Sequence, residues 1–326
     1  MREPGVATAP SPMSSAQSAT PRSDARPFVI LNPASNGGRA ARLRKIIERA
    51  LLGGRGELAL TQARGDATRL AAEAARAGRD VVVVGGDGAI HEAAGGVITS
   101  GASVAFGVVP AGSGNDFALH VARAPLDPLR ALDLALTAPV DPVDVGMVNG
   151  EYFVNALGVG LDANVAVRAE RLKRYGLSGQ SLYMTSALTE LLFHYDECPT
   201  LTLQYDDAAP IHQVFALVAM SIGPTYGGGF KINPTADPQD QLFDMCMLSK
   251  PPLLRALRLL PAVERGKHIG QPETRIIRCQ RVTLEADHPI NAQLDGEFMQ
   301  AARIEVSLLP GALALRRGPA PAPAAR

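Results

Sequence analysis

The stretch VVVVGGDGAIHEAAGG, residues 81–96, decides the fold class of this chain. Four valines in a row show no polar alternation, which is typical of a central strand buried on both faces. The glycine-rich turn that follows leads into a helix-like segment over 89–97. The sequence therefore predicts a strand, a loop and a helix in succession.

The same unit recurs on both sides of this stretch. Strand-like segments begin at residues 28, 57 and 103, and helix-like segments follow them up to about residue 136. Alternation of strands and helices indicates a parallel sheet with helices on its faces. We therefore predict an N-terminal α/β domain over 27–140.

The pattern changes after residue 140. Residues 141–160 read as two strands joined by the turn dipeptide Asn149-Gly150. One helix is predicted over 179–195, and the remaining segments are strand-like: 200–205, 211–222, 242–249, 275–285 and 302–309. A run of strands after a βα run predicts a second, all-β domain over 141–310.

The two ends of the chain differ from the rest in composition. Residues 1–26 are rich in Ala, Pro and Ser and lack the apolar stretch of a secretion signal, so we expect a disordered leader. The last ten residues, 317–326, read RGPAPAPAAR and have no means of burial, so we expect the folded part to run over about 27–316 within a chain whose tail, 311–326, is partly disordered.

Overall composition bounds the functions that the chain can have. Its 326 residues, 46% of them apolar, are enough for two domains. The 32 basic and 32 acidic residues cancel, which argues against a nucleic-acid partner held by net charge. Three cysteines without a CxxC pair favour neither a disulfide framework nor a zinc ribbon, and fit the cytoplasm. No apolar run reaches the roughly 18 residues that would cross a bilayer.

Three loops rich in small residues follow strands of the predicted parallel sheet: 32–38, 85–88 and 110–116. The carboxyl ends of such strands, together with the helix N-termini behind them, form a natural phosphate site. A GG pair alone is often only a tight turn, and the spacing matches neither GxGxxG nor GxxxxGK[ST]. Three such loops on one sheet favour a nucleotide site.

The segments NPASNGG (32–38), GGDGAIHE (85–92), PAGSGNDFA (110–118) and QLDGEF (293–298) resemble the diacylglycerol kinase catalytic-domain family. That family includes bacterial diacylglycerol kinases and the sphingosine and ceramide kinases. GGDG alone is shared with NAD kinases, but its combination with the other motifs is more specific. The resemblance spans about 28–310 and implies a β-sandwich second domain with an active-site cleft between the domains.

The resemblance also implies roles for particular residues. The DGE motif would supply a general base through Asp295 or Glu297, with Asp295 favoured, and Asp87 would lie nearest the metal-phosphate chemistry. Mg²⁺ bridging the phosphates of ATP is the implied cofactor. The residues implied to contact or frame the nucleotide are Asn32, Ser35, Thr61, Gly85, Gly86, Asp87, Gly88, Ala89, Ile90, His91, Glu92, Gly112, Ser113, Asn115 and Asp116.

A second, structural Mg²⁺ site is implied by the segment PTADPQDQLFD, residues 234–244. Asp240, the carbonyl of Leu242 and Asp237 match the family's ligands. Gln241 stands where the family has Gly, and a positive φ there would strain a side chain. Two further departures are Ala89, where the family has Thr, and His91, where Asn is common.

Taken together, these motifs predict an ATP-dependent lipid kinase acting on diacylglycerol or a related lipid. The alternatives are a kinase of a soluble substrate such as NAD, and a nucleotide-binding regulator without catalysis. A lipid substrate implies transient membrane contact, and the eight basic against two acidic residues over 250–281 predict salt-sensitive docking there. The helix over 181–193 carries an apolar stripe that fits a core or a lipid groove. Exposed sheet edges would allow a homodimer.

Overall fold

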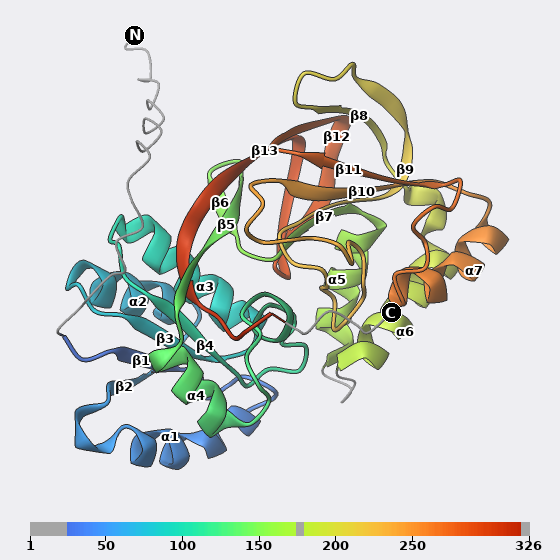
Figure 1. The fold of residues 1–326 in the computed structure, drawn as a ribbon. Coiled ribbons are helices and arrows are strands. Elements are labelled where there is room, and N and C mark those ends of the chain that lie inside the picture. The colour runs from blue at the N-terminus through green and yellow to red at the C-terminus, as the bar shows by residue number, and fades with distance from the viewer. Residues whose placement is uncertain (1–24, 174–178, 321–326) are drawn as a thin grey trace, which may run out of the picture.

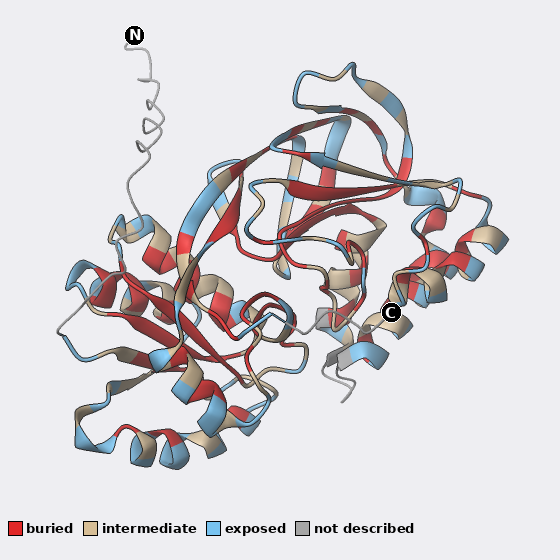
Figure 2. Ribbon diagram, in the orientation of Figure 1, coloured by how far each residue is buried: buried red, intermediate tan, exposed pale blue. Residues whose placement is uncertain are grey.

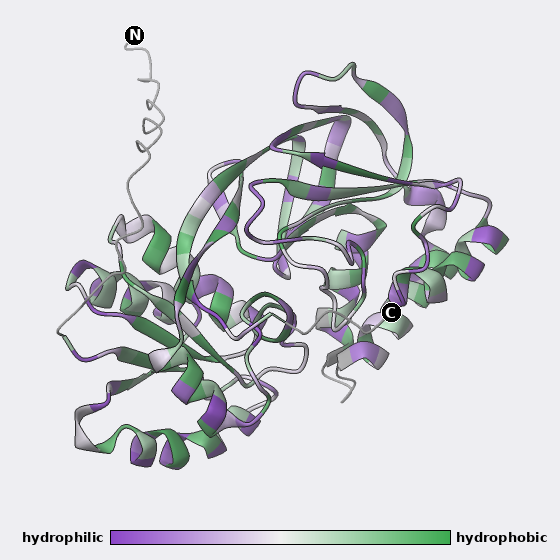
Figure 3. Cartoon of the chain, viewed as in Figure 1, coloured by the Kyte–Doolittle hydropathy of each residue, from purple (hydrophilic) through white to green (hydrophobic). Residues whose placement is uncertain are grey.

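The computed structural model describes residues 25–173 and 179–320, so most of the predicted leader and the last six residues lie outside it. The chain forms two domains whose strands join in one continuous sheet (Figure 1). Buried residues run along the strands of both domains (Figure 2), and hydrophobic residues are concentrated in the same strands (Figure 3).

The first domain is the predicted α/β unit. Four parallel strands lie in the order β4-β3-β1-β2: β1 (Phe28–Leu31), β2 (Glu57–Leu60), β3 (Val81–Gly85) and β4 (Phe106–Pro110). Every residue of β3 and β4 is buried, as the unbroken valine run predicts. The covering helices are α1 (Arg44–Ala50), α2 (Asp66–Arg76), α3 (Asp87–Ser100) and α4 (Pro128–Thr137).

The second domain is built mainly from antiparallel strands, which confirms the predicted β-rich class. Its strands are β5 (Val140–Val148), β6 (Glu151–Phe153), β7 (Ala156–Gly160), β8 (Thr200–Tyr205), β9 (Ile211–Ser221), β10 (Phe243–Ser249), β11 (Thr274–Cys279), β12 (Arg281–Leu294) and β13 (Glu297–Arg316). Their inner faces enclose a separate core in which the rings of Phe153 and Phe243 stack with centroids 5.7 Å apart.

The last strand joins the two domains. β13 pairs with β12 and β5, and at Leu315 it also pairs with Phe106 of β4. Leu313 and Leu315 are buried in the core of the first domain. The sequence pattern ends the second domain at residue 310, but residues 311–316 continue the strand because their alternate side chains have this core to fill. The folded part thus reaches residue 316 as expected, and the domain boundary at 310 lies six residues too early.

Two helices of the second domain are absent from the sequence prediction. α5 (Leu161–Lys173) mixes charged with small apolar residues, and α7 (Leu253–Glu264) contains Pro261 in its interior. Both features weaken a helical pattern read from sequence. The predicted helix over 179–195 is present as α6 (Gly179–Phe193) and ends two residues earlier.

Candidate active site

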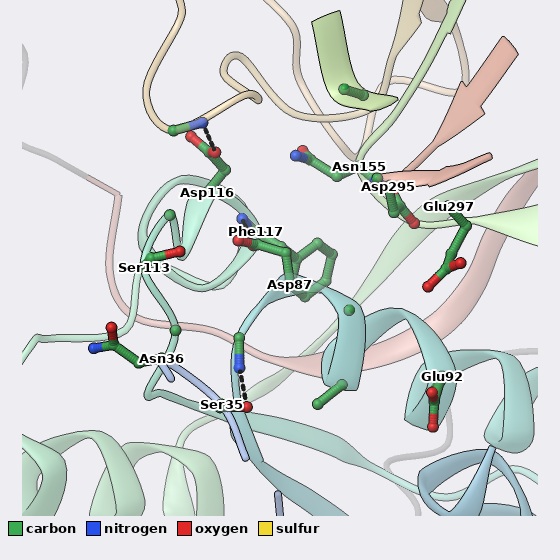
Figure 4. A pocket seen from close by; sticks show the side chains of 18 of the residues that line it. Ser35, Asn36, Asp87, Glu92, Ser113, Asp116, Phe117, Asn155, Asp295 and Glu297 are labelled. Atoms are coloured by element: carbon green, nitrogen blue, oxygen red, sulfur yellow. Dashed lines mark hydrogen bonds between the residues drawn. The ribbon is translucent and has the colours of Figure 1, made fainter. Parts of the chain in front are cut away.

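A cleft of about 1260 Å³ opens between the two domains. The three strand-end loops of the first domain form one wall. The other wall includes residues 154–156, the start of α5, the glycine turn at Gly227 and Gly228, the β12–β13 turn at Asp295 and Gly296, and the first two residues of β13. Figure 4 shows that side chains from both walls point into this space.

The first wall depends on close contact between two glycines. A Cβ atom built on Gly112 would lie 2.4 Å from the Cα of Gly86, so neither loop tolerates a side chain at this point. The backbone N–H of Gly86 donates to Ser35 Oγ at 3.3 Å, which ties the loop after β1 to the loop after β3. The floor therefore exposes backbone beside the N-terminus of α3, an arrangement that favours phosphate.

Two carboxylates lie above this floor. Asp87 accepts the backbone N–H of Asn115 at 2.8 Å and that of Phe117 at 3.2 Å. Burial, followed by the charge of Asp116, raises the pKa of Asp87 to about 7. Burial also raises the pKa of Asp116, which accepts the N–H of Gly228 at 2.8 Å. A cation beside two adjacent carboxylates offsets their mutual repulsion and favours their ionised forms, so Asp87 and Asp116 fit a Mg²⁺ ion carried with a nucleotide.

Asp295 faces these two groups from the second domain. Its Oδ1 accepts the backbone N–H groups of Asn155 at 2.9 Å and Ala156 at 3.0 Å. Its Oδ2 accepts the N–H of Val154 at 2.7 Å and lies 2.9 Å from Nδ1 of His91. The residue adopts a φ of 51° at the turn between β12 and β13. This side chain, 2% exposed, is thus fixed in one orientation at the edge of the cleft.

His91 crosses from α3 to this carboxylate. Burial lowers its pKa, but the hydrogen bond and charge of Asp295, aided by Glu297 and Glu92, outweigh burial and raise it. A raised pKa favours the imidazolium form, so the contact is a charge-assisted bond between the domains. Glu297, the other candidate for the general base, forms an ion pair with Arg64 of the first domain.

The structure brings most of the predicted nucleotide residues to the cleft. Four of them do not line it: Gly85, Ile90, His91 and Asn115. Asn115 instead holds the loop before it, because its Oδ1 accepts the N–H of Gly112 at 2.7 Å. Those that line the cleft are Asn32, Ser35, Thr61, Gly86, Asp87, Gly88, Ala89, Glu92, Gly112, Ser113 and Asp116, together with Asp295 and Glu297.

Sequence reasoning missed Asp162, at the start of α5. Its carboxylate accepts a hydrogen bond from Gln293 Nε2 at 3.0 Å, and burial raises its pKa to about 6. A second cavity of about 100 Å³, lined almost entirely by apolar side chains, lies between α6, α7 and the sheet. Both cavities are lined by Asp162, Val165, Tyr183, Tyr226 and Gly227, so they meet at this carboxylate. No local pattern in the sequence marks Asp162.

The predicted structural Mg²⁺ site has a different arrangement. Asp240 Oδ1 accepts the N–H of Leu242 at 3.1 Å, and its Oδ2 forms an ion pair with Arg278 of β11. The carboxylate of Asp237 accepts the N–H of Gln239 at 3.2 Å. Within residues 25–173 and 179–320, no group of three or more acidic, His or Cys side chains is arranged to hold a metal. A guanidinium already neutralises Asp240, so this donor set does not fit the ion.

The φ of Gln241 is 64°, so this position does take the left-handed conformation for which glycine is suited. Its N–H donates to Asp144 Oδ2 at 2.8 Å, and its carbonyl accepts from Gln280 Nε2 at 3.1 Å. These bonds offset the strain of placing a side chain there.

An α/β domain with phosphate-type loops, facing carboxylates of a β-rich domain across a cleft, defines a two-domain kinase architecture. Two family models match the chain: "Diacylglycerol kinase catalytic domain" over 26–148 and "YegS C-terminal NAD kinase beta sandwich-like domain" over 155–317. The chain belongs to the diacylglycerol kinase family of lipid kinases.

Individual relatives agree with this assignment. The chain is 31% identical to a diacylglycerol kinase of Mycobacterium tuberculosis, over 77% of this chain and 81% of the relative. It is 29% identical to a diacylglycerol kinase of Bacillus subtilis, over 73% of this chain and 78% of that protein. The solved structure of a proposed diacylglycerol kinase from Bacillus anthracis str. Sterne shares the fold, with a TM-score of 0.74 at 22% identity, covering 90% of this chain and 97% of that one.

Proposed function

We propose that this chain transfers the γ-phosphoryl group of ATP to the hydroxyl group of diacylglycerol or a related lipid. One observation carries the proposal: Asp87 and Asp116 of the first domain and Asp295 of the second face one cleft, which continues into an apolar cavity. The first feature suits a nucleotide with its cation. The second suits an acceptor that has an acyl chain.

ATP would bind along the first wall. The backbone around Gly86 and Gly112, with Ser35 and Ser113 beside it, presents small polar groups to the phosphates. Mg²⁺, when bound, would neutralise charge on the transferring phosphoryl group. Asp87 and Asp116 are the residues placed to hold it, and neither forms an ion pair with a residue that the structure describes.

The transfer itself requires a proton acceptor for the lipid hydroxyl. The lipid oxygen forms a bond to the γ-phosphorus while the bond to the bridging oxygen breaks, and that oxygen leaves with ADP and the electron pair. Asp295 takes the hydroxyl proton. A carboxylate has about four acceptor positions, and three backbone N–H groups and His91 occupy those of Asp295. The bond to His91 involves a side chain, so it is the one that can yield to the substrate.

The apolar cavity beside Asp162 would receive part of an acyl chain. Leu191, Leu217, Phe230 and Leu260 are among the side chains that line it. The stripe on α6 therefore contributes both to the core and to this cavity, since Leu182 is fully buried while Ala187 and Leu191 face the space. A soluble acceptor such as NAD has no apolar group that would need this cavity.

The test is incubation of the protein with radiolabelled ATP, Mg²⁺ and a panel of lipids in mixed micelles, with NAD as a parallel acceptor. Label in diacylglycerol or another lipid supports the proposal. Label in NAD alone would establish the soluble-substrate alternative. Binding of ATP in calorimetry with no label in any acceptor would establish the regulator, and either of these results would overturn the proposal.

A further inference from the structure

The second domain exposes a cluster of large apolar side chains at one end. Among the residues that the structure describes, twelve large hydrophobic side chains are exposed, and five of them belong to α6 and α7. We name these five the α6–α7 ridge: Leu188 (43% exposed), Leu192 (49%), Phe193 (74%), Leu253 (40%) and Leu254 (62%). Exposed apolar side chains gathered in this way mark an interaction surface.

A hydrogen bond links the two helices that carry the ridge. The hydroxyl of Tyr195, just after α6, donates to the carbonyl of Pro251, just before α7, at 2.6 Å. Figure 1 shows both helices at the end of the second domain that lies away from α1 to α4. The apolar cavity lies directly behind them, because Ala187 and Leu191 of α6 and Ala256 and Leu260 of α7 line it.

The charge on the outward faces of these helices is one-sided. The exposed side chains of α6 within 180–193 are Gln180, Ser181, Thr185, Leu188, Leu192 and Phe193, and those of α7 are Leu253, Leu254, Arg258 and Pro261. None of them is acidic. Arg258, and Arg265 one residue beyond α7, form no ion pair with any residue in the described ranges.

The acidic residues of this region are all engaged. Glu190 is buried and pairs with Arg168. Glu264 accepts a hydrogen bond from Gln180 at 2.6 Å. Beyond the end of α6, Asp196 pairs with Lys250, and Glu197 lies 2.8 Å from His194. The face thus combines protruding apolar groups with unpaired arginines, which is the chemistry of a helix that lies in an anionic lipid interface.

The basic run over 250–281 contributes less charge than its sequence suggests. Ion pairs neutralise Lys250, Arg255, Arg278 and Arg281, with Asp196, Glu273, Asp240 and Asp207 as their partners. Attachment through this region would therefore depend mainly on apolar insertion. Salt sensitivity would be a secondary feature of it.

We propose that the α6–α7 ridge inserts into the interface of an anionic phospholipid bilayer, which brings the apolar cavity behind the two helices close to the lipid. This proposal rests on the proposed function, because a lipid acceptor explains why an apolar cavity lies behind these helices. The ridge would anchor the second domain at the surface. A lipid could then pass from the bilayer into the apolar cavity beside Asp162 without entering bulk water.

The experiment is flotation of the nucleotide-free protein with phosphatidylcholine vesicles that contain or lack phosphatidylglycerol. The test variant is Phe193→Asp with Leu254→Asp. The matched control is Leu52→Asp with Leu126→Asp, since these leucines are 71% and 68% exposed on the first domain. We expect the test variant to bind at least tenfold more weakly and the control to bind like the wild type. A third variant, Arg258→Gln with Arg265→Gln, should lose only the preference for phosphatidylglycerol.

Equal binding of the test variant and the wild type would overturn the proposal, as would an equal loss in the control. Binding that disappears in high salt but survives the test substitutions would also overturn it and would favour the basic run. Flotation needs no phosphoryl transfer. If the test variant loses vesicle binding but keeps its turnover on a short-chain, dispersed diacylglycerol, the result supports the ridge and leaves the kinase assignment intact. If binding depends on the ridge but the wild type phosphorylates no lipid, the kinase assignment alone is refuted.

Discussion

The contact between His91 and Asp295 predicts a specific dependence of stability on pH. Replacing His91 by Asn keeps a side-chain donor but removes the positive charge. The side chains of His91 and Asp295 are 19% and 2% exposed, so solvent screens their bond only weakly. A hydrogen bond to a charged group typically stabilises a fold by about 1.5–3 kcal/mol. We expect the substitution to lower the free energy of unfolding by this amount at pH values where the imidazole is protonated in both the folded and the unfolded chain.

The direction of this pH dependence follows from the raised pKa of His91. The charges acting on His91 are those of Asp295, Glu297 and Glu92, and together they hold its folded pKa above the usual value near 6.5. A raised pKa means that the stabilisation is fully present below about pH 6.5 and is lost as pH rises through the folded pKa. The difference in unfolding free energy between wild type and His91→Asn should therefore be largest in mild acid and should shrink as pH rises through the folded pKa, which lies above about 6.5.

Urea unfolding of both proteins across this range measures the difference directly. The predicted result is a gap in unfolding free energy of about 1.5–3 kcal/mol near pH 5.5 that declines steadily as pH rises. A gap that stays constant with pH would show that the contact carries no charge. A gap that grows with pH would show that the histidine is held neutral, and would refute the assignment of an ion pair.

Three further substitutions test other parts of the site. Asp87→Asn should abolish turnover. It should also remove a decline in the unfolding free energy of the wild type between about pH 4 and pH 7, because a carboxyl group whose pKa is raised to about 7 lowers the stability of the fold as it ionises. This decline amounts to at most about 4 kcal/mol in urea unfolding, and an unchanged slope in the variant would contradict the assignment. Gly112→Ala should weaken ATP binding at least tenfold in calorimetry, because its Cβ would meet the backbone of Gly86, whereas Gly95→Ala on α3 has open space and should bind normally; equal affinities would contradict the close contact. EDTA should leave the thermal midpoint of the wild type unchanged, and Arg278→Met should make the midpoint rise with added Mg²⁺. A fall in the wild-type midpoint with EDTA would show that a cation is bound after all, with the unpartnered Oδ2 of Asp244 as a candidate ligand.

The elements that sequence predicts well are those with a strong local signal. The valine run of β3 and the glycine loops after β3 and β4 carry their structure in adjacent residues. They establish the parallel sheet and the position of the cleft. α7 was not predicted because Pro261 and the basic residues obscure its apolar spacing.

The parts that sequence could not predict depend on long-range contacts. His91 and Asp295 are 204 residues apart, and nothing near either residue indicates their pairing. The same holds for Arg278, which read as a docking residue over 250–281 but lies against Asp240. The C-terminal part of β13 read as tail because the core that Leu313 and Leu315 fill belongs to the other end of the chain.

The most direct test of the central claim is a comparison of Asp295→Asn with the wild type in two assays on the same preparations. Calorimetry measures ATP binding, and radiolabel transfer measures phosphorylation of diacylglycerol. If Asp295 is the proton acceptor, ATP affinity should remain within a few-fold of the wild type while transfer falls by about 10²–10⁴-fold, the range for loss of a general base. Transfer within tenfold of the wild type, from protein that binds ATP normally, would contradict the account.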